Sequence, residues 1–291
     1  RQMCIRDSTY TFISYSAGDQ EGMSATATAY IGPKAPRDIN EEAVTLVETT
    51  PGTFNLAWSA ISTDIDGNAI PAANISYKIY TVVKNGSMLS IGEEIGTTTE
   101  CKFTYNTEPI TRQQLFYLAV QPFNRQVGSA RSTMGRVLVG TPYELPVIYT
   151  GNSSTDQYLS FAGQGTPEIG NYFNFEVKAQ DGDDSFYAIM NSKVGFKTYL
   201  QTGMINLTGK SPAVSLYVYS LTNSDGTSTP DGNMTTMSVI CDGNETVLDS
   251  FTNEDLEGNM WHKKKFSLEA FAGKTVMIRI TATSNVFVYT C

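Results

Sequence analysis

The chain has 291 residues and a formal net charge of −9 at pH 7, and hydrophobic residues make up 41% of it. This length predicts about two domains with room for part of a third, and the acidic balance argues against nucleic acid and anionic membrane surfaces as partners. No run of about 18 apolar residues occurs, so no segment of the sequence is a candidate transmembrane helix. The 24 Gly, 16 Tyr and 14 Phe favour strands and turns, and we expect an all-β fold.

Residues 10–31 predict a β-hairpin, because two runs of alternating apolar and polar side chains flank a Gly/Asp turn at 18–22. The same pattern returns at 115–139. The two copies end at Gly32 and Gly140, which stand 108 positions apart. A repeat of roughly a hundred residues that is built from strands predicts tandem β-sandwiches.

The repeat sets the expected domain boundaries. Residues 34–141 are expected to be a complete sandwich, and residues 1–33 the C-terminal two strands of a truncated sandwich of the same family. The first residue is not Met, and Cys291 directly follows a strand-like alternation, so we expect this chain to be a piece of a longer protein. Residues 1–8 resemble translated adaptor sequence, and we expect them to lie outside the native fold.

Seven short strands are predicted in the complete copy. Their ranges are 43–47, 53–59, 75–83, 88–91, 102–105, 115–123 and 129–139. A Trp on the second strand, an aromatic-rich third strand, and Asn124 with Gly128 after the sixth resemble the fibronectin type III domain. That resemblance implies that Trp58 and Tyr77 pack in the core. It also implies that Phe116 keeps the packing of the family's corner tyrosine and loses only its hydroxyl hydrogen bond.

The stretch Gly140-Thr-Pro-Tyr-Glu-Leu-Pro146 is expected to connect two domains. Its two prolines fix φ and remove backbone donors, so neither a helix nor a central strand can run through it. We therefore predict a semi-extended linker at 142–146.

Residues 147–291 contain about ten predicted strands separated by acidic Gly/Asn loops, which indicates a two-sheet jelly roll that is truncated at its C-terminus. One run is more specific: Cys241-Asp-Gly-Asn244, then Trp261, the corner 266–274 and the aliphatic strand 275–281. This run resembles the jelly-roll modules of the cleaved-adhesin and MAM type. Together with the fibronectin-like copy, it resembles surface or secreted multidomain proteins of the Bacteroidota.

These resemblances imply a non-catalytic adhesion, binding and spacer region that works at the cell surface or outside the cell, as monomeric beads within a longer chain. Its partner would be an extracellular protein or a glycan. The alternative is a carbohydrate-binding accessory region of a larger secreted glycoside hydrolase or peptidase. Catalysis has little support in the residues themselves, because His262 is the only His, and the one candidate carboxylate pair, Glu168 with Glu176, is interrupted by Gly170 and Asn171. We therefore expect no enzyme.

The candidate metal site is the turn formed by Asp181, Asp183 and Asp184. Clustered carboxylates on a Gly turn can present several hard oxygens to a structural Ca²⁺, and a plain polar turn is the alternative. The cleaved-adhesin resemblance implies calcium in loops of this kind. Four Cys without C-x-x-C spacing argue against a zinc site. Cys241 with Cys291 is the only candidate disulfide within one predicted domain, and buried unpaired thiols are the alternative.

Candidate ligand-binding rings are Trp261 and Tyr187, because carbohydrate binding needs exposed aromatic rings on a sheet face. The other available rings are Tyr172, Tyr217 and Tyr219. Most of these rings alternate with aliphatic residues, which favours a place in the core. The lysines at 263–265 flank Trp261. We expect them to form a solvated face, with a local contact to an anionic group as the alternative.

Overall fold

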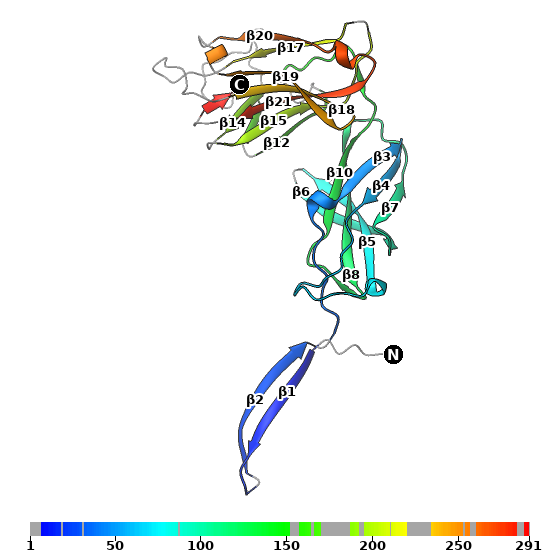
Figure 1. The fold of residues 1–291 in the computed structure, drawn as a ribbon, viewed down its shortest axis with the longest axis vertical. Coiled ribbons are helices and arrows are strands. Elements are labelled where there is room, and N and C mark those ends of the chain that lie inside the picture. The colour runs from blue at the N-terminus through cyan, green and yellow to red at the C-terminus, as the bar shows by residue number, and fades with distance from the viewer. Residues whose placement is uncertain are drawn as a thin grey trace. The chain divides into compact units, whose positions relative to one another are not determined.

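The fold of this protein is given by a computed structural model (Figure 1). The residues that the structure describes are 7–18, 20–30, 32–86, 88–151, 157–163, 166–169, 187–191, 195–209, 211–219, 234–252, 254–256, 260–283 and 288–290. These residues form 22 strands and four 3₁₀ turns of three residues each. The predicted all-β class, with successive sandwiches, is therefore confirmed. No helix in this part of the chain is long and apolar enough to cross a membrane.

The chain divides into two compact units. The first comprises Arg1–Pro109 and Leu115–Val137, and the second comprises Ile110–Gln114 and Leu138–Cys291. The finer domain boundaries that the sequence repeat suggests stay predictions.

The predicted N-terminal hairpin is present as β1 (Asp7–Tyr15) and β2 (Glu21–Tyr30), which pair antiparallel. Phe12 lies opposite Ala25 in this register, and its side chain is 63% exposed. Because directly opposite residues of antiparallel strands share a face, the hairpin carries an exposed aromatic ring on its alanine-bearing face.

The rest of the first unit is a two-sheet β-sandwich, as the predicted fold class implied. Its sheets have the orders β3-β4-β7 and β10-β8-β5-β6, with β9 beside β8. The strands are β3 Thr45–Thr50, β4 Thr53–Ala57, β5 Ile75–Asn85, β6 Met88–Thr98, β7 Lys102–Asn106, β8 Gln114–Asn124, β9 Val127–Gly128 and β10 Thr133–Val139. The 3₁₀ turns are η1 Glu41–Ala43 and η2 Ala72–Asn74.

The core of this sandwich follows from strict alternation along β4. Phe54 and Leu56 are fully buried, and the strand leads to Trp58, which is also buried. The Trp58 ring meets the Tyr77 ring edge-on with 5.1 Å between centroids, and Phe54 stacks on Phe116 at 4.1 Å. The predicted core roles of Trp58 and Tyr77, and the packing role of Phe116, are confirmed.

The turn between β3 and β4 depends on Gly52. Its φ is +81°, and a Cβ added there would collide with the carbonyl oxygen of Thr107. Both facts require glycine, because an L side chain disfavours this backbone conformation and the neighbouring main chain leaves no room.

The second unit is a β-sandwich with more strands. Its strands are β11 Tyr143–Glu144, β12 Leu159–Gly163, β13 Thr166–Ile169, β14 Tyr187–Asn191, β15 Lys197–Thr202, β16 Ile205–Asn206, β17 Ala213–Val218, β18 Met234–Cys241, β19 Asn244–Thr252, β20 His262–Ser267, β21 Thr275–Thr283 and β22 Val288–Thr290. The 3₁₀ turns are η3 Glu254–Leu256 and η4 Glu269–Phe271. The largest sheet joins β11, β16, β21, β15 and β12, with β18 against β21 and β19 against β18. The smaller sheets are β13-β14-β22 and β17-β20.

The main core of the second unit lies between the large sheet and the β17-β20 pair. Val276 and Ile278 of β21 and Val239 of β18 supply buried aliphatic side chains from the large sheet. Leu216 of β17 and Phe266 of β20 pack against them from the other side. This packing fixes which face of the β17-β20 pair is turned inward.

The predicted linker at 142–146 differs from a free spacer. Its residues Tyr143 and Glu144 form β11, which pairs parallel with β16. The main-chain N–H of Tyr143 donates to the carbonyl of Met204 at 2.8 Å, and the amide of Asn206 donates to the Glu144 carboxylate at 2.9 Å. The prolines exclude a central strand as expected, but they leave room for two residues of edge pairing.

Candidate ligand-binding face

The strands β17 and β20 form a two-stranded antiparallel sheet with two different faces. Its register sets Leu216 opposite Lys264, Tyr217 opposite Lys263, and Ser215 opposite Lys265. Opposite residues share a face and the face alternates along each strand. Because Leu216 packs into the core, Tyr217, Lys263 and Lys265 lie on the outer face.

The outer face carries a row of aromatic and basic side chains, which we call the aromatic–lysine strip. It consists of Lys265, Lys263, Tyr217, Tyr219 and Trp261. The Tyr217 ring is 40% exposed, and the ammonium of Lys263 lies 5.4 Å from its centroid. One residue beyond the paired strands, Tyr219 meets Trp261 edge-on with 5.4 Å between ring centroids. The strip therefore combines ring surface and positive charge on two adjacent strands.

The sequence predicted that the three lysines at 263–265 form one solvated face. The structure contradicts this prediction, because the three side chains lie on two different faces. Lys263 and Lys265 are exposed on the outer face. Lys264 is turned inward, with its ammonium 5.0 Å from the ring centroid of buried Phe251. Hydrogen bonds from Thr252 hold the pKa of the nearby Asp255 carboxyl below its ordinary value, and the charge of Lys264 adds to this effect.

The two predicted ligand-binding rings, Trp261 and Tyr187, have different outcomes in the structure. Trp261 belongs to the strip, as a half-buried ring. Tyr187 lies on β14, but its side chain falls outside the described residues. Core positions were expected for most of the available rings, but the Tyr217 ring is 40% exposed on the outer face, and Tyr219 is half-buried. The sequence does alternate tyrosines with aliphatic residues along β17, but the aliphatic residues Val214 and Leu216 are the ones that face the core.

Most of the residues predicted to bind metal or to form a disulfide lie outside the described part of the chain. Asp181, Asp183 and Asp184 lie outside the described residues, so the calcium site stays a prediction. Among the residues that are described, no group of three or more His, Cys, Asp and Glu lies close enough to hold a metal ion. Cys241 is a buried free thiol whose pKa is raised by burial, and Cys291 falls outside the described residues.

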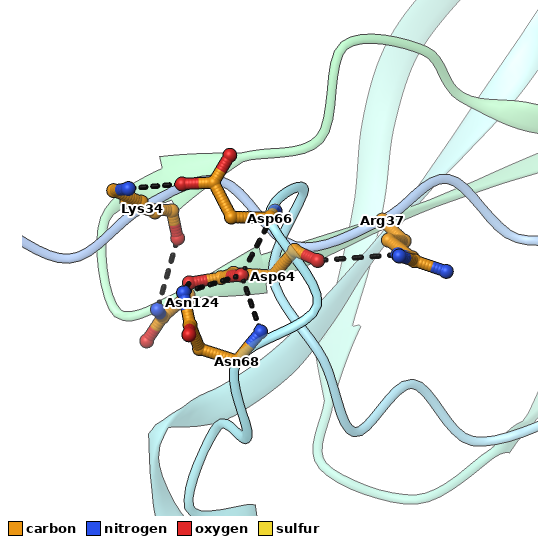
Figure 2. Close-up of polar contacts among 6 residues, drawn as sticks. All are labelled: Lys34, Arg37, Asp64, Asp66, Asn68 and Asn124. Atoms are coloured by element: carbon orange, nitrogen blue, oxygen red, sulfur yellow. Dashed lines mark hydrogen bonds and ion pairs between the residues drawn. The ribbon is translucent and has the colours of Figure 1, made fainter.

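The first unit holds a polar network centred on Asp64, which Figure 2 shows. One carboxylate oxygen of Asp64 accepts hydrogen bonds from the main-chain N–H groups of Asp66 and Asn68, both at 2.9 Å. The Asn68 amide donates to both carboxylate oxygens. Burial by itself would raise the pKa of Asp64, but these donors outweigh it and hold the pKa below its ordinary value.

The same network holds the segment that leads into the sandwich. Lys34 forms an ion pair with Asp66, and its carbonyl accepts from the Asn124 amide at 2.9 Å. The guanidinium of Arg37 donates to the carbonyl of Asp64 at 3.2 Å (Figure 2). The contact with Asp66 raises the pKa of Lys34. Because these groups form their hydrogen bonds and ion pairs with one another, the network has a structural role and holds the loop in place.

A second polar cluster lies on the large sheet of the second unit. The Arg279 guanidinium lies 4.4 Å from the ring centroid of Tyr199, donates to the Glu245 carboxylate at 2.6 Å, and donates twice to the Gln201 carbonyl oxygen at 3.0 and 2.7 Å. The Ser238 hydroxyl donates to the same carboxylate at 2.6 Å. These residues come from adjacent strands and satisfy much of each other's bonding capacity, so they brace the sheet. The aromatic–lysine strip is the stronger candidate for a ligand.

The comparisons with known proteins report only distant similarities in structure. No protein-family model and no curated protein matches the chain. Three fibronectin domains (FN1-FN3) of chicken CNTN1 match at 11% identity over 96% of this chain and 73% of theirs, with a TM-score of 0.27. The CBM22-1-CBM22-2 tandem of Paenibacillus barcinonensis Xyn10C matches at 10% identity over 89% and 96%, with a TM-score of 0.29. An α-L-rhamnosidase from Dictyoglumus thermophilum matches at 9% identity over 88% of this chain but only 27% of the enzyme, with a TM-score of 0.26. These scores are too low to carry a conclusion about function.

Proposed function

We propose that this chain is a non-catalytic binding and spacer region of a multidomain protein that works at the cell surface or outside the cell. Its ligand-binding face is the aromatic–lysine strip, and its ligand is a glycan. The observation that carries the proposal is the exposed ring of Tyr217 on the outer face of β17, next to the ring pair of Tyr219 and Trp261.

The chemistry of the strip suits a sugar. Tyrosine and tryptophan rings offer flat apolar surface to the C–H face of a sugar ring, and their polar atoms tolerate a wet surface. Lysine ammonium groups donate to hydroxyl oxygens. Tyr217, Lys263 and Lys265 stand on paired strands, and Tyr219 and Trp261 lie directly beyond their ends, which limits the conformational entropy lost on binding.

The spacer role is supported by the first unit. Its aromatic residues Trp58 and Tyr77 pack in the core. The polar groups around Asp64 form hydrogen bonds with one another. A carbohydrate-binding accessory region of a larger secreted hydrolase or peptidase is the second candidate. The strip would serve either protein in the same way, and the two candidates differ in what the rest of the parent chain contains.

The test is glycan-array binding of the full chain, followed by titration of the best ligand. Tyr217→Ala should weaken binding at least about fivefold, because an aromatic stacking contact contributes roughly 1 kcal/mol. Tyr15→Ala is the matched control, since Tyr15 is 58% exposed on the N-terminal hairpin. A chain that binds no glycan, or an equal loss for both variants, would refute the strip as the binding face.

A further inference from the structure

We infer that the aromatic–lysine strip selects glycans that carry carboxylate or sulfate groups, and that Lys263 and Lys265 provide this selectivity. The inference rests on the proposed function and adds the chemical class of the ligand. It depends on three features of the strip: the spacing of its lysines, the lack of a carboxylate partner for them among the described residues, and the position of one ammonium beside an exposed ring.

The spacing places two positive charges in one row. Lys263 and Lys265 are two residues apart on β20, so they project from the same face about 7 Å apart. Their cross-strand neighbours are Tyr217 and Ser215. Neither neighbour carries a negative charge, whereas an opposite-charge pair is a usual way to stabilise such positions.

Lys263 and Lys265 also lack an ion-pair partner among the described residues, as does the exposed Lys84 of the first unit. Four other lysines each lie within 4 Å of a carboxylate; these are Lys34, Lys78, Lys102 and Lys274. Lys263 and Lys265 form no ion pair with any carboxylate among the described residues, although the chain has 29 acidic residues against 20 basic ones. Two exposed ammonium groups on one face, with no carboxylate partner in the part of the chain that the structure describes, favour an anion supplied by a ligand.

The position of Lys263 joins charge to ring surface. Its ammonium lies 5.4 Å from the Tyr217 centroid, so the ring holds the charge beside its own exposed part. A uronate or a sulfated sugar carries an apolar ring face and an anionic group on the same residue, which matches this pairing. From Lys265 to His262 the strand rises by about 10 Å, and Trp261 lies one residue further along the chain, which leaves room for a short run of sugar rings.

The net charge of the whole chain further limits the classes of anionic ligand that the strip can bind. With a net charge of −9, the protein repels densely charged polyanions at long range. Nucleic acid, with one charge per phosphate and strong dependence on many basic contacts, is therefore disfavoured. An acidic glycan with more widely spaced charges suits two local lysines.

The experiment uses matched polysaccharides and the full chain. The carboxylate pair is partly methyl-esterified sodium polygalacturonate and its full methyl ester, and the sulfate pair is a sparsely sulfated dextran and dextran, so that the charges are widely spaced. The wild-type chain should bind the charged member of at least one pair more tightly, and that pair identifies the anion. Lys263→Gln with Lys265→Gln should weaken this binding about tenfold, which is 1.4 kcal/mol, and leave binding of the neutral member unchanged.

The control variant is Lys84→Gln with Lys102→Gln, which removes the same charge from two exposed strand positions of the first unit. It should bind like the wild type. Equal binding of charged and neutral members, unaffected by the Lys263 and Lys265 changes, would overturn the inference, while a Tyr217→Ala loss in the same assay would leave the proposed function standing. Absence of binding to all four polysaccharides would also overturn the inference, while the glycan array decides the proposed function separately. Tighter, Lys263-dependent binding to an oligothymidylate would assign the strip to nucleic acid instead.

Discussion

Asp64 and Asn68 are joined by four hydrogen bonds. The Asp64 carboxylate accepts three of them, and the main-chain N–H of Asp64 donates the fourth to the carbonyl of Asn68 at 2.9 Å. The two residues frame a tight loop in which the main chain turns back on itself. Lys34 closes the loop from outside through its ion pair with Asp66. A lysine of the chain itself thus supplies the positive charge that the acidic loop needs.

The first prediction concerns the pH dependence of this loop. Because the folded pKa of Asp64 is below its ordinary value of 3.8, its contribution to stability is fully present above that value and is lost as pH falls through the folded pKa. Asp64→Ala should therefore lower the stability of the first unit at pH 7 and flatten its decline below about pH 4.

The measurement is urea unfolding followed by Trp58 fluorescence, in a Trp261→Phe background that leaves one Trp. Glu93→Gln is the control, since Glu93 is an exposed carboxylate of β6 that makes no side-chain hydrogen bond or ion pair with described residues. An Asp64→Ala variant whose acid profile matches the wild type would contradict the assignment.

The second prediction compares two glycines with positive φ. Gly52 has φ +81° and a carbonyl in the way of any Cβ, whereas Gly86 has φ +63° and open space around it. Gly86→Ala should cost about 1 kcal/mol, which is the backbone penalty alone. Gly52→Ala should cost clearly more, because the chain around Thr107 must also shift. Equal losses in the same fluorescence assay would mean that the crowding at Gly52 relaxes freely.

The third prediction tests the aromatic core of the first unit. Phe54 is fully buried and stacked on Phe116, so Phe54→Ala should lower the free energy of unfolding by about 3–5 kcal/mol. Val47→Ala on neighbouring β3 removes a side chain that is 53% exposed, and it should change stability by less than about 0.5 kcal/mol. Similar losses for the two variants would place Phe54 outside the cooperative core.

The first unit was the more predictable part, for a physical reason. Its strands alternate large apolar residues with polar ones, and aromatic pairs such as Trp58 with Tyr77 mark the inner face unambiguously. In the second unit, β15 escaped prediction although it lies inside the large sheet. Its inner face includes buried Thr198, so the alternation of polarity that marks a half-buried strand is nearly absent.

The candidate site was predictable only in part. Trp261 could be proposed from its residue type, but the outward position of Tyr217 could not, because alternation gives two faces without saying which is buried. That choice is made by tertiary packing, when Leu216 and Phe266 meet the large sheet. The separation of Lys264 from its two neighbours follows from the same choice.

The last prediction concerns calcium and rests on the sequence. Asp181, Asp183 and Asp184 offer hard oxygen ligands of the kind that Ca²⁺ prefers. If they bind Ca²⁺ only in the folded state, free calcium at a hundredfold excess over Kd should stabilise the second unit by about 2.7 kcal/mol. Melting curves of the full chain in EDTA and in millimolar calcium measure this shift, and Asp181→Asn with Asp183→Asn should abolish it. Asp249→Asn with Glu269→Gln removes the same charge elsewhere in the unit and should leave the shift intact. Identical curves in EDTA and calcium, or a shift that survives the loss of Asp181 and Asp183, would remove this site, because mass action allows no stabilisation without binding to the folded state.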